Sequence, residues 1–212
     1  MNDRNENGGA RVHVVDDDPA MRDSVSFLLE SVGIDVTCYD HAEDFLAKYS
    51  PDMRGCVLLD VRMPGMSGLQ LHAKLKEESI RIPVIIVTAH SDVPMAVAAM
   101  RSGAFDLIEK PYNDQVLIDR VREAIERDAS EHHEHVQEAA IRERLAELSP
   151  REDEVMRLVV SGFLNKQIAS KLGLSIKTVE VHRSRVMQKM EARSLADLVR
   201  MTMRVGIEGE GA

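Results

Sequence analysis

The hydrophobic pattern divides this chain into two parts of different texture. From Arg11 onward, short apolar runs alternate with amphipathic stretches. The apolar runs predict five β-strands, at 12–15, 34–39, 55–60, 83–89 and 105–110. Their apolar residues are nearly continuous rather than alternating, which is typical of strands that are buried on both faces.

A helix is predicted after each of these strands. In the first one, Val25, Leu28 and Leu29 repeat at helical spacing between Pro19 and Gly33, which are start and stop signals. The other helices are predicted near 41–49, 68–77, 94–102 and 113–128. Five β-α units predict an α/β domain with a parallel five-stranded sheet covered by helices on both faces.

From Leu148 the pattern becomes entirely helical. Ser149-Pro150-Arg151-Glu152 has the composition of a helix start, with a capping box and proline in the first turn. Gly162 and Gly173 stand where the chain must reverse. Four helices are predicted in this all-α domain, near 150–161, 165–172, 176–190 and 194–205.

The stretch 129–147 between the two parts is predicted to be a helical linker. It has no Gly or Pro and is rich in Glu and Ala, and the pattern leaves open whether it continues the preceding helix. Ile141, Leu145 and Leu148 have a coiled-coil-like spacing over too short a length to establish a coil. Its three histidines, His132, His133 and His135, fit a solvated face better than a metal site.

Composition indicates where in the cell the protein is located. No run of about 18 apolar residues is present, and the polar residues 1–10 are expected to be disordered and lack a signal region. We therefore expect a cytoplasmic protein without a membrane partner. Cys38 and Cys56 lie in apolar runs and are expected to be buried, reduced thiols.

The net charge of −9 is unevenly distributed. Residues 1–129 contain 14 Lys/Arg against 23 Asp/Glu, and residues 130–147 contain 2 against 5. Residues 148–212 contain 11 against 8 and are therefore basic. An acidic first part and a basic second part suggest different partners for the two domains.

Polar residues gather where the predicted strands end. Asp16, Asp17 and Asp18 follow the first strand, Asp60 ends the third, Thr88 the fourth and Lys110 the fifth. The carboxyl ends of parallel strands meet at one edge, where converging carboxylates favour a cation such as Mg²⁺. An aspartate can also act as a nucleophile toward phosphorus. Singly, Asp17 or Asp18 could be a helix cap and Lys110 a surface ion pair, but their joint placement favours a phosphoryl site.

Four segments, VVDDD (14–18), LLDVRMPGMSG (58–68), VTAH (87–90) and EKP (109–111), resemble the signature of two-component receiver domains. The resemblance implies a flavodoxin-like receiver domain at 11–128, with Asp60 as phosphoryl acceptor from a sensor histidine kinase. It also implies Mg²⁺ ligands at Asp16, Asp17, Asp60 and the Arg62 main-chain carbonyl, phosphoryl contacts from Thr88 and Lys110, and a cis Lys110–Pro111 bond. One departure is Leu107, which stands where many receivers have a switch aromatic; Phe105 lies two residues earlier.

The predicted helix at 176–190 has the features of a DNA-recognition helix. Val179, Arg183, Val186 and Met190 form a mostly apolar stripe, and Ser175 is a plausible N-cap. The opposite face gathers Lys177, Val181, Ser184 and Gln188, flanked by Glu180 and Arg185. With the preceding helix and Gly173, it forms a helix-turn-helix pattern that can enter the major groove, although periodicity alone also allows an ordinary bundle helix.

Residues 148–190 are similar to the LuxR/NarL-type output domain, which would span 148–212 in this chain. Two receiver segments, SDVPMAV (91–97) and AMRSGAFDLIEKP, make the whole chain resemble the FixJ branch of that family. The resemblance implies base contacts from Glu180, Val181 and Ser184 in double-stranded promoter DNA. Phosphate contacts are implied for Lys177, Thr178, Arg183 and Arg185, and a dimer contact for Leu195, Leu198, Val199 and Met203.

The expected function is therefore that of a response regulator rather than an enzyme. Phosphorylation is expected to produce a homodimer that binds DNA and regulates transcription with RNA polymerase, with activation favoured over repression. An aspartate-based phosphatase would need an acid two positions after Asp60, where Arg62 stands. A module that binds only proteins would leave the basic recognition face unexplained.

Overall fold

The computed structural model describes residues 9–89 and 93–207, and these residues divide into two compact units between His132 and His133. Most of the N-terminal segment predicted to be disordered lies outside the described residues, as do His90, Ser91 and Asp92 of the motifs above. None of the helices in the described part of the chain has the length and hydropathy that a membrane span requires.

The first unit contains a five-stranded parallel sheet, as the sequence predicts. Its strands are β1 (Arg11–Val15), β2 (Val36–Tyr39), β3 (Gly55–Asp60), β4 (Val84–Thr88) and β5 (Asp106–Glu109). The strand order is β2-β1-β3-β4-β5, which is the flavodoxin-like order. The expected α/β fold is thereby confirmed for this unit.

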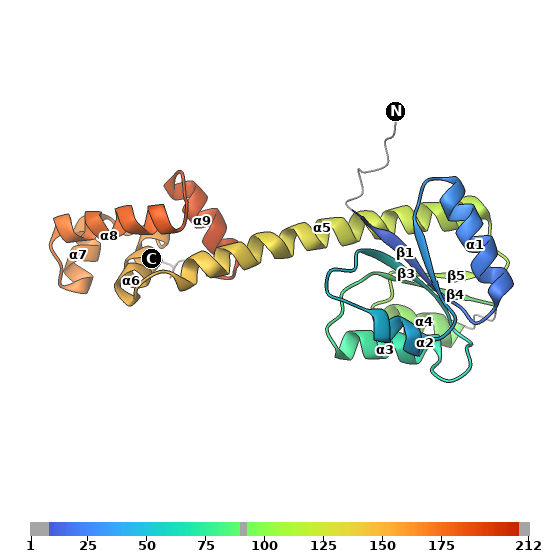
Figure 1. The fold of residues 1–212 in the computed structure, drawn as a ribbon. Helices are drawn as coiled ribbons and strands as arrows, with labels where there is room; N and C mark the ends of the chain where they lie inside the picture. Colours follow the sequence, from blue (N-terminus) through green and yellow to red (C-terminus); the bar gives the residue numbers. More distant parts are fainter. Residues whose placement is uncertain (1–8, 90–92, 208–212) are drawn as a thin grey trace, which may run out of the picture. The chain divides into compact units, whose positions relative to one another are not determined.

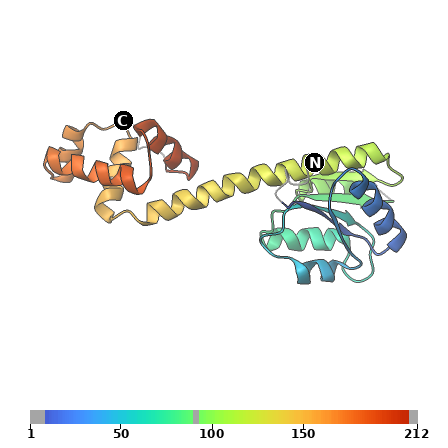
Figure 2. The ribbon, with the colours of Figure 1, turned by 45° about the horizontal axis from the view of Figure 1, so that its top comes forward.

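Helices cover both faces of the sheet (Figures 1 and 2). One face carries α1 (Pro19–Ser31) and α5 (Asp114–Ala146), whose residues Leu29 and Leu117 are fully buried against it. The other carries α2 (Ala42–Lys48), α3 (Gly68–Glu77) and α4 (Val93–Arg101), with Phe45 and Leu71 fully buried. Burial of these apolar stripes stabilises the unit and holds the strand ends in place.

Local sequence signals determine where the helices begin. The Asp18 side chain accepts a hydrogen bond from the Ala20 main-chain N–H at 2.9 Å, so Asp18 caps α1. Ser67 and Gln70 form a capping box at the start of α3. At Gly68 a Cβ atom would lie 2.0 Å from the Asp60 carbonyl oxygen, so only glycine allows α3 to start this close to β3.

Helix α5 is one continuous helix of 33 residues, which settles whether the predicted linker continues the helix before it. Asp128, near the end of the first unit, is tied to the start of β3. Arg54 Nε and the Gly55 main-chain N–H each donate to Asp128 Oδ2 at 2.9 Å. A partly buried ion pair thus fixes α5 against the sheet before the helix leaves the unit.

The second unit consists of α6 (Pro150–Val160), α7 (Asn165–Leu172), α8 (Ile176–Lys189) and α9 (Leu195–Arg204), together with the end of α5. Ile141 of α5 is 5% exposed and belongs to the core of this unit, so the core extends upstream of Leu148. The predicted capping box of Ser149 and Glu152 is confirmed.

The prediction for the two cysteines is half wrong. Cys56, on central strand β3, is buried and free, as predicted. Cys38 is free but exposed, because β2 is an edge strand and one of its faces is only partly covered.

Candidate functional sites

The first candidate site lies at the point where the strand order reverses. From β1 the chain passes to β2 on one side, and from β3 it passes to β4 on the other. The diverging connections leave a crevice beyond the carboxyl ends of β1 and β3. Asp16, directly after β1, and Asp60, the last residue of β3, lie at this crevice.

Lys110 joins these two carboxylates. Its Nζ atom lies 2.7 Å from Asp60 Oδ1 and 2.9 Å from Asp16 Oδ2, and all three side chains are largely buried. Burial alone would lower the pKa of Lys110, but the hydrogen bonds and negative charges of Asp60 and Asp16 outweigh burial and raise that pKa. The amine is therefore a permanent positive charge between two acids.

Main-chain and side-chain donors hold the remaining atoms of the two acids. The Arg62 N–H donates to Asp60 Oδ2 at 2.7 Å, and the Asp18 N–H donates to Asp16 Oδ1 at 2.9 Å. Arg22 Nη1 donates to the Asp16 carbonyl oxygen at 2.6 Å. Arg22 is not among the residues that the sequence predicts for this site, although helical side chains point back toward the N-terminus and Arg22 stands in the first turn of α1.

The other predicted site residues are close to Lys110, Asp16 and Asp60 through a main-chain hydrogen bond or through their position in the sequence. Thr88 ends β4, is 2% exposed, and its carbonyl oxygen accepts from the Lys110 main-chain N–H at 2.7 Å. Asp17 is exposed beside Asp16, and Arg62 is exposed two residues after Asp60. The Lys110–Pro111 bond is cis, as expected.

The donor set fits a hard cation. The described residues contain no cluster of three or more His, Cys, Asp or Glu side chains arranged around a metal position. Mg²⁺ needs only one or two carboxylates, with phosphate and water oxygens completing its shell. Asp16 and Asp60 supply two carboxylates, and Asp17 and the Arg62 carbonyl lie next to them in the chain.

Leu107 and Phe105 lie on different sides of the sheet. Leu107 packs against the core under α2, α3 and α4. Phe105 packs against the core under α1 and α5, where Arg127 lies 5.9 Å from its ring centroid. Phe105 therefore cannot serve as a substitute for an aromatic residue at position 107.

The second candidate site is the helix-turn-helix formed by α7, α8 and the turn at Gly173. Gly173 has φ +64°, a left-handed conformation that favours glycine and ends α7. Ser175 caps α8 through the Thr178 N–H, at 3.0 Å. Val179, Val186 and Met190 are buried in the core, so the predicted inward face of α8 is confirmed.

The outward face of α8 is exposed. Its exposed residues are Lys177, Glu180, Val181, Ser184, Arg185 and Gln188, and Thr178 is half-buried. Arg183 is half-buried and its Nη1 atom donates to Asn165 Oδ1, at the start of α7, at 2.7 Å. Arg183 thus also holds the two helices of the motif together.

One predicted dimer contact is wrong. Leu198 is 1% exposed in the core of its own unit, so it cannot contact a second copy. Leu195 and Met203 are 44% and 61% exposed, and Val199 is half-buried. The pattern of α9 did not separate these two faces because apolar residues occur on both.

Comparison with known families gives two matches, one in each unit. Residues 12–122 match the response regulator receiver domain, and residues 146–202 match the bacterial regulatory proteins of the luxR family. The first match covers the crevice with Asp16, Asp60 and Lys110, and the second covers the helix-turn-helix.

Individual relatives match nearly the whole chain. FixJ of Rhizobium meliloti is 50% identical over 92% of this chain and 96% of its own, and nodulation protein W of Bradyrhizobium diazoefficiens is 46% identical over 93% and 87%. The solved structure of the response regulator StyR aligns with a TM-score of 0.84 at 39% identity, covering 92% of this chain and 98% of that one.

Proposed function

This chain belongs to the FixJ-type response regulators, in which a receiver domain precedes a LuxR-type DNA-binding domain, and we propose that Asp60 is its phosphoryl acceptor. It is a phosphorylation-dependent regulator of transcription and not a classical enzyme. A sensor kinase supplies the phosphoryl group, and DNA is the target of the second domain.

The observation that carries the proposal is the ion pair of Lys110 with Asp60 and Asp16 at the crevice. In the transfer, an Asp60 carboxylate oxygen forms a bond to phosphorus while the bond from phosphorus to the donor's leaving group breaks. The Lys110 ammonium and the Thr88 hydroxyl are the partners for the phosphoryl oxygens.

The crevice would also bind the magnesium ion that receivers use. We propose Asp16, Asp17, Asp60 and the Arg62 carbonyl as its protein ligands, because Asp16 and Asp60 share the Lys110 amine and the other two stand within two residues of these acids. The ion would neutralise negative charge on the transferring group. We propose that the receiver catalyses only its own phosphoryl transfer and dephosphorylation, rather than turnover of a separate substrate.

The response follows in the second domain. Phosphorylation promotes homodimer formation, and two helix-turn-helix units then bind two half-sites of promoter DNA. We propose activation of transcription through RNA polymerase as the outcome, with a cytoplasmic location and no membrane partner.

The test is chemical labelling of the full chain. With a small phosphodonor and Mg²⁺, followed by borohydride reduction and mass spectrometry, the acyl phosphate is expected on Asp60. Asp60→Asn should abolish labelling, whereas Asp52→Asn, at an exposed loop position, should not. Robust labelling of the Asp60→Asn variant would contradict the assignment.

A further inference from the structure

The turn after β1 is held on both sides of Asp17. The Asp18 main-chain N–H donates to Asp16 Oδ1 at 2.9 Å, and this contact fixes the peptide that follows Asp17. The Arg22 Nη1 atom donates to the Asp16 carbonyl oxygen at 2.6 Å, which fixes the peptide that precedes Asp17. Two separate contacts therefore set the backbone of one exposed acid.

The Asp17 carboxylate itself is open to a ligand. It forms no hydrogen bond or ion pair with any other residue that the structure describes. By contrast, both carboxylate oxygens of Asp16 have partners, because Oδ2 lies 2.9 Å from Lys110 Nζ and Oδ1 accepts from Asp18. Asp17 is thus the acid of this pair with more free lone pairs.

Arg22 is committed to this turn. Its main-chain N–H donates to the Asp18 carbonyl oxygen at 3.1 Å, which places it in the first turn of α1. Its side chain is half-buried, and within the described ranges no carboxylate forms an ion pair with it. The guanidinium therefore acts on the main chain at Asp16 and not on a neighbouring acid.

The Arg22 hydrogen bond restricts where the Asp17 carboxylate can lie. A hydrogen bond from a charged donor is short and strong, and the peptide is planar, so a fixed Asp16 carbonyl also fixes the nitrogen of Asp17. Mg²⁺ requires a nearly ideal octahedral arrangement of its ligands, which makes its affinity sensitive to their placement. Residues that orient metal ligands typically change metal affinity by about 10- to 100-fold.

We propose that Arg22 is a positioning residue for magnesium at this crevice. By holding the Asp16 carbonyl, it orients the peptide that joins Asp16 to Asp17 and so keeps the Asp17 carboxylate beside that of Asp16. Arg22 contacts neither the ion nor the phosphoryl group. This inference rests on the proposed function, which makes these two acids ligands of the ion.

The charge of Arg22 and its hydrogen bond act on magnesium in opposite directions. A guanidinium near the crevice repels a cation, so loss of the charge alone would strengthen binding. Loss of the hydrogen bond releases the backbone before Asp17 and weakens binding. The sign of the change therefore separates positioning from simple electrostatics.

Titration of the full chain with MgCl₂ measures this effect, with the amide signals of Asp17 and Asp18 in ¹⁵N-labelled protein as the readout. Arg22→Met removes the donor and the charge and should weaken Mg²⁺ binding by about tenfold. Arg22→Lys keeps the charge and a donor and should recover part of the affinity. Unchanged or stronger binding in Arg22→Met would overturn the proposal. A loss in Arg22→Lys as large as that in Arg22→Met would overturn the role of the hydrogen bond.

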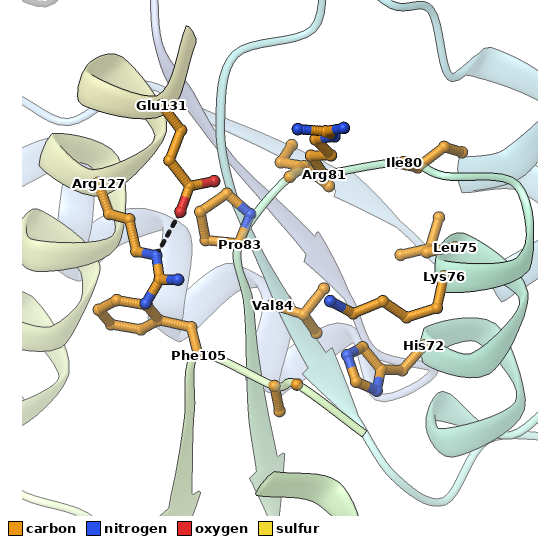
Figure 3. Close-up of a pocket in the computed structure, with 13 residues that line it drawn as sticks. His72, Leu75, Lys76, Ile80, Arg81, Pro83, Val84, Phe105, Arg127 and Glu131 are labelled. Carbon is orange, nitrogen blue, oxygen red and sulfur yellow. Dashed lines mark hydrogen bonds and ion pairs between the residues drawn. The ribbon is translucent and has the colours of Figure 1, made fainter. Parts of the chain in front are cut away.

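Arg127→Met is the matched control, because it removes the same charge at the opposite edge of the sheet. Arg127 pairs with Glu131 at 2.7 Å, beside Pro83 and Phe105, which precede β4 and β5 (Figure 3). The control variant should bind Mg²⁺ as the parent chain does. Equal weakening by Arg127→Met and Arg22→Met would contradict a local effect at Asp17.

Phosphorylation by a small phosphodonor separates positioning from a general structural role. In Arg22→Met the half-saturating Mg²⁺ concentration should rise about tenfold, while the rate at saturating Mg²⁺ stays close to that of the parent. A lower saturated rate with an unchanged half-saturating concentration would show that Arg22 only supports the fold. Absence of Mg²⁺-dependent shifts at Asp17 and Asp18 in the parent chain would overturn the magnesium ligands of the proposed function together with this inference. Parent binding that Arg22→Met leaves intact would overturn this inference alone.

Discussion

At the residue scale, the acceptor site depends on one cation. Asp16 and Asp60 have side chains that are 9% and 11% exposed, and both face the Lys110 amine. Two carboxylates this close repel each other unless a positive charge lies between them. Lys110 therefore has a structural role in the unphosphorylated chain as well as the proposed contact with the phosphoryl group.

Lys110→Ala should lower the free energy of unfolding by about 3 kcal/mol at pH 7, because two largely buried acids lose their counter-charge. Millimolar Mg²⁺ should stabilise the variant more than the parent chain, since a cation at the crevice relieves the repulsion. Urea denaturation with and without Mg²⁺ measures both effects. Lys74→Ala, which loses only an exposed pair at 4.0 Å, should change stability by less than about 0.5 kcal/mol. Equal stabilisation of variant and parent by Mg²⁺ would count against this account.

At the element scale, the outward face of α8 should divide into two functions. Lys177, in the first turn, is placed to contact a phosphate, whereas Val181 and Ser184 lie at the centre of the exposed face. Lys177→Ala should weaken all DNA sites equally and reduce the salt slope by about one unit. Val181→Ala or Ser184→Ala should change the ranking of single-base operator variants by about 1–3 kcal/mol at one position.

Gln188→Ala is the matched control for α8, because Gln188 is exposed on the same face but lies toward the C-terminal end, away from the half that enters the groove. Its affinity and ranking should be unchanged. Binding titrations against a panel of operator variants at several salt concentrations measure the Lys177 variant, the Val181 and Ser184 variants, and the Gln188 control. A parallel loss on every operator from Ser184→Ala and Lys177→Ala alike would show that the assignment of base readout is wrong.

The start of α6 is joined to the end of α8 through Glu152. Its Oε2 atom accepts from Lys189 Nζ at 2.7 Å and from the Ser149 N–H at 2.9 Å, and these bonds lower the pKa of Glu152 to about 2. The ionised form therefore stabilises the fold. This contribution is complete above the ordinary pKa of 4.5 and is lost as the pH falls toward 2.

Glu152→Gln should cost the second unit about 1–2 kcal/mol at pH 7, because the hydrogen bonds to a charged acceptor become neutral ones. Its stability should also fall less between pH 4.5 and pH 2. Hydrogen exchange of the α6 and α8 amides in the full chain reports this unit separately. Asp153→Asn, on the more exposed pair with Arg157, should have a smaller effect. If the stability of Glu152→Gln depended on pH as that of the parent chain does, the proposed contribution of ionised Glu152 would be wrong.

Much of the order of strands and helices could be predicted from the sequence, because the apolar runs and helix caps that the sequence shows agree with the burial of these elements in the fold. Strands β1, β3 and β4 start and end within one residue of the predicted positions, since their apolar runs are buried on both faces. Edge strand β5, which is only partly buried, also lies within one residue of its predicted bounds. Ser149 and Ser175 cap the helices that they were expected to cap. The continuity of α5 could not be decided, because absence of Gly and Pro allows a helix without requiring it.

Other features depend on neighbours that no local pattern shows. Cys38 is exposed only because β2 is at the edge of the sheet, and Leu198 is buried because α6 packs on its side of α9. The distance from Lys110 to Asp16 depends on strand order across the sheet. The sequence predicts both residues at the same edge of the sheet, but it does not predict that their side chains pair.

At the scale of the whole molecule, the receiver unit has exposed apolar side chains on the helices before and after edge strand β5. Val97 and Met100 on α4 are 42% and 46% exposed, and Val116 on α5 is 48% exposed. Exposed apolar residues that gather near one edge are typical of an interaction surface. We expect the receivers to pair through the 94–128 region, which contains this surface, formed by Val97, Met100 and Val116.

One small helix-turn-helix neutralises too few DNA phosphates for tight binding, so it needs a second copy on an adjacent half-site. We therefore expect phosphorylation of the receiver to act by promoting the pairing of two chains. Light scattering at micromolar concentration should give a monomer for the unphosphorylated chain and twice that mass after phosphorylation. Met100→Glu should keep the phosphorylated chain monomeric, because it places a charge in the pairing surface. Phe27→Glu changes a residue that is 77% exposed on α1, outside that surface, and should still allow the dimer. An unchanged mass on phosphorylation would rule out dimerisation as the output, whereas loss of the dimer in both variants would place the pairing surface elsewhere on the receiver.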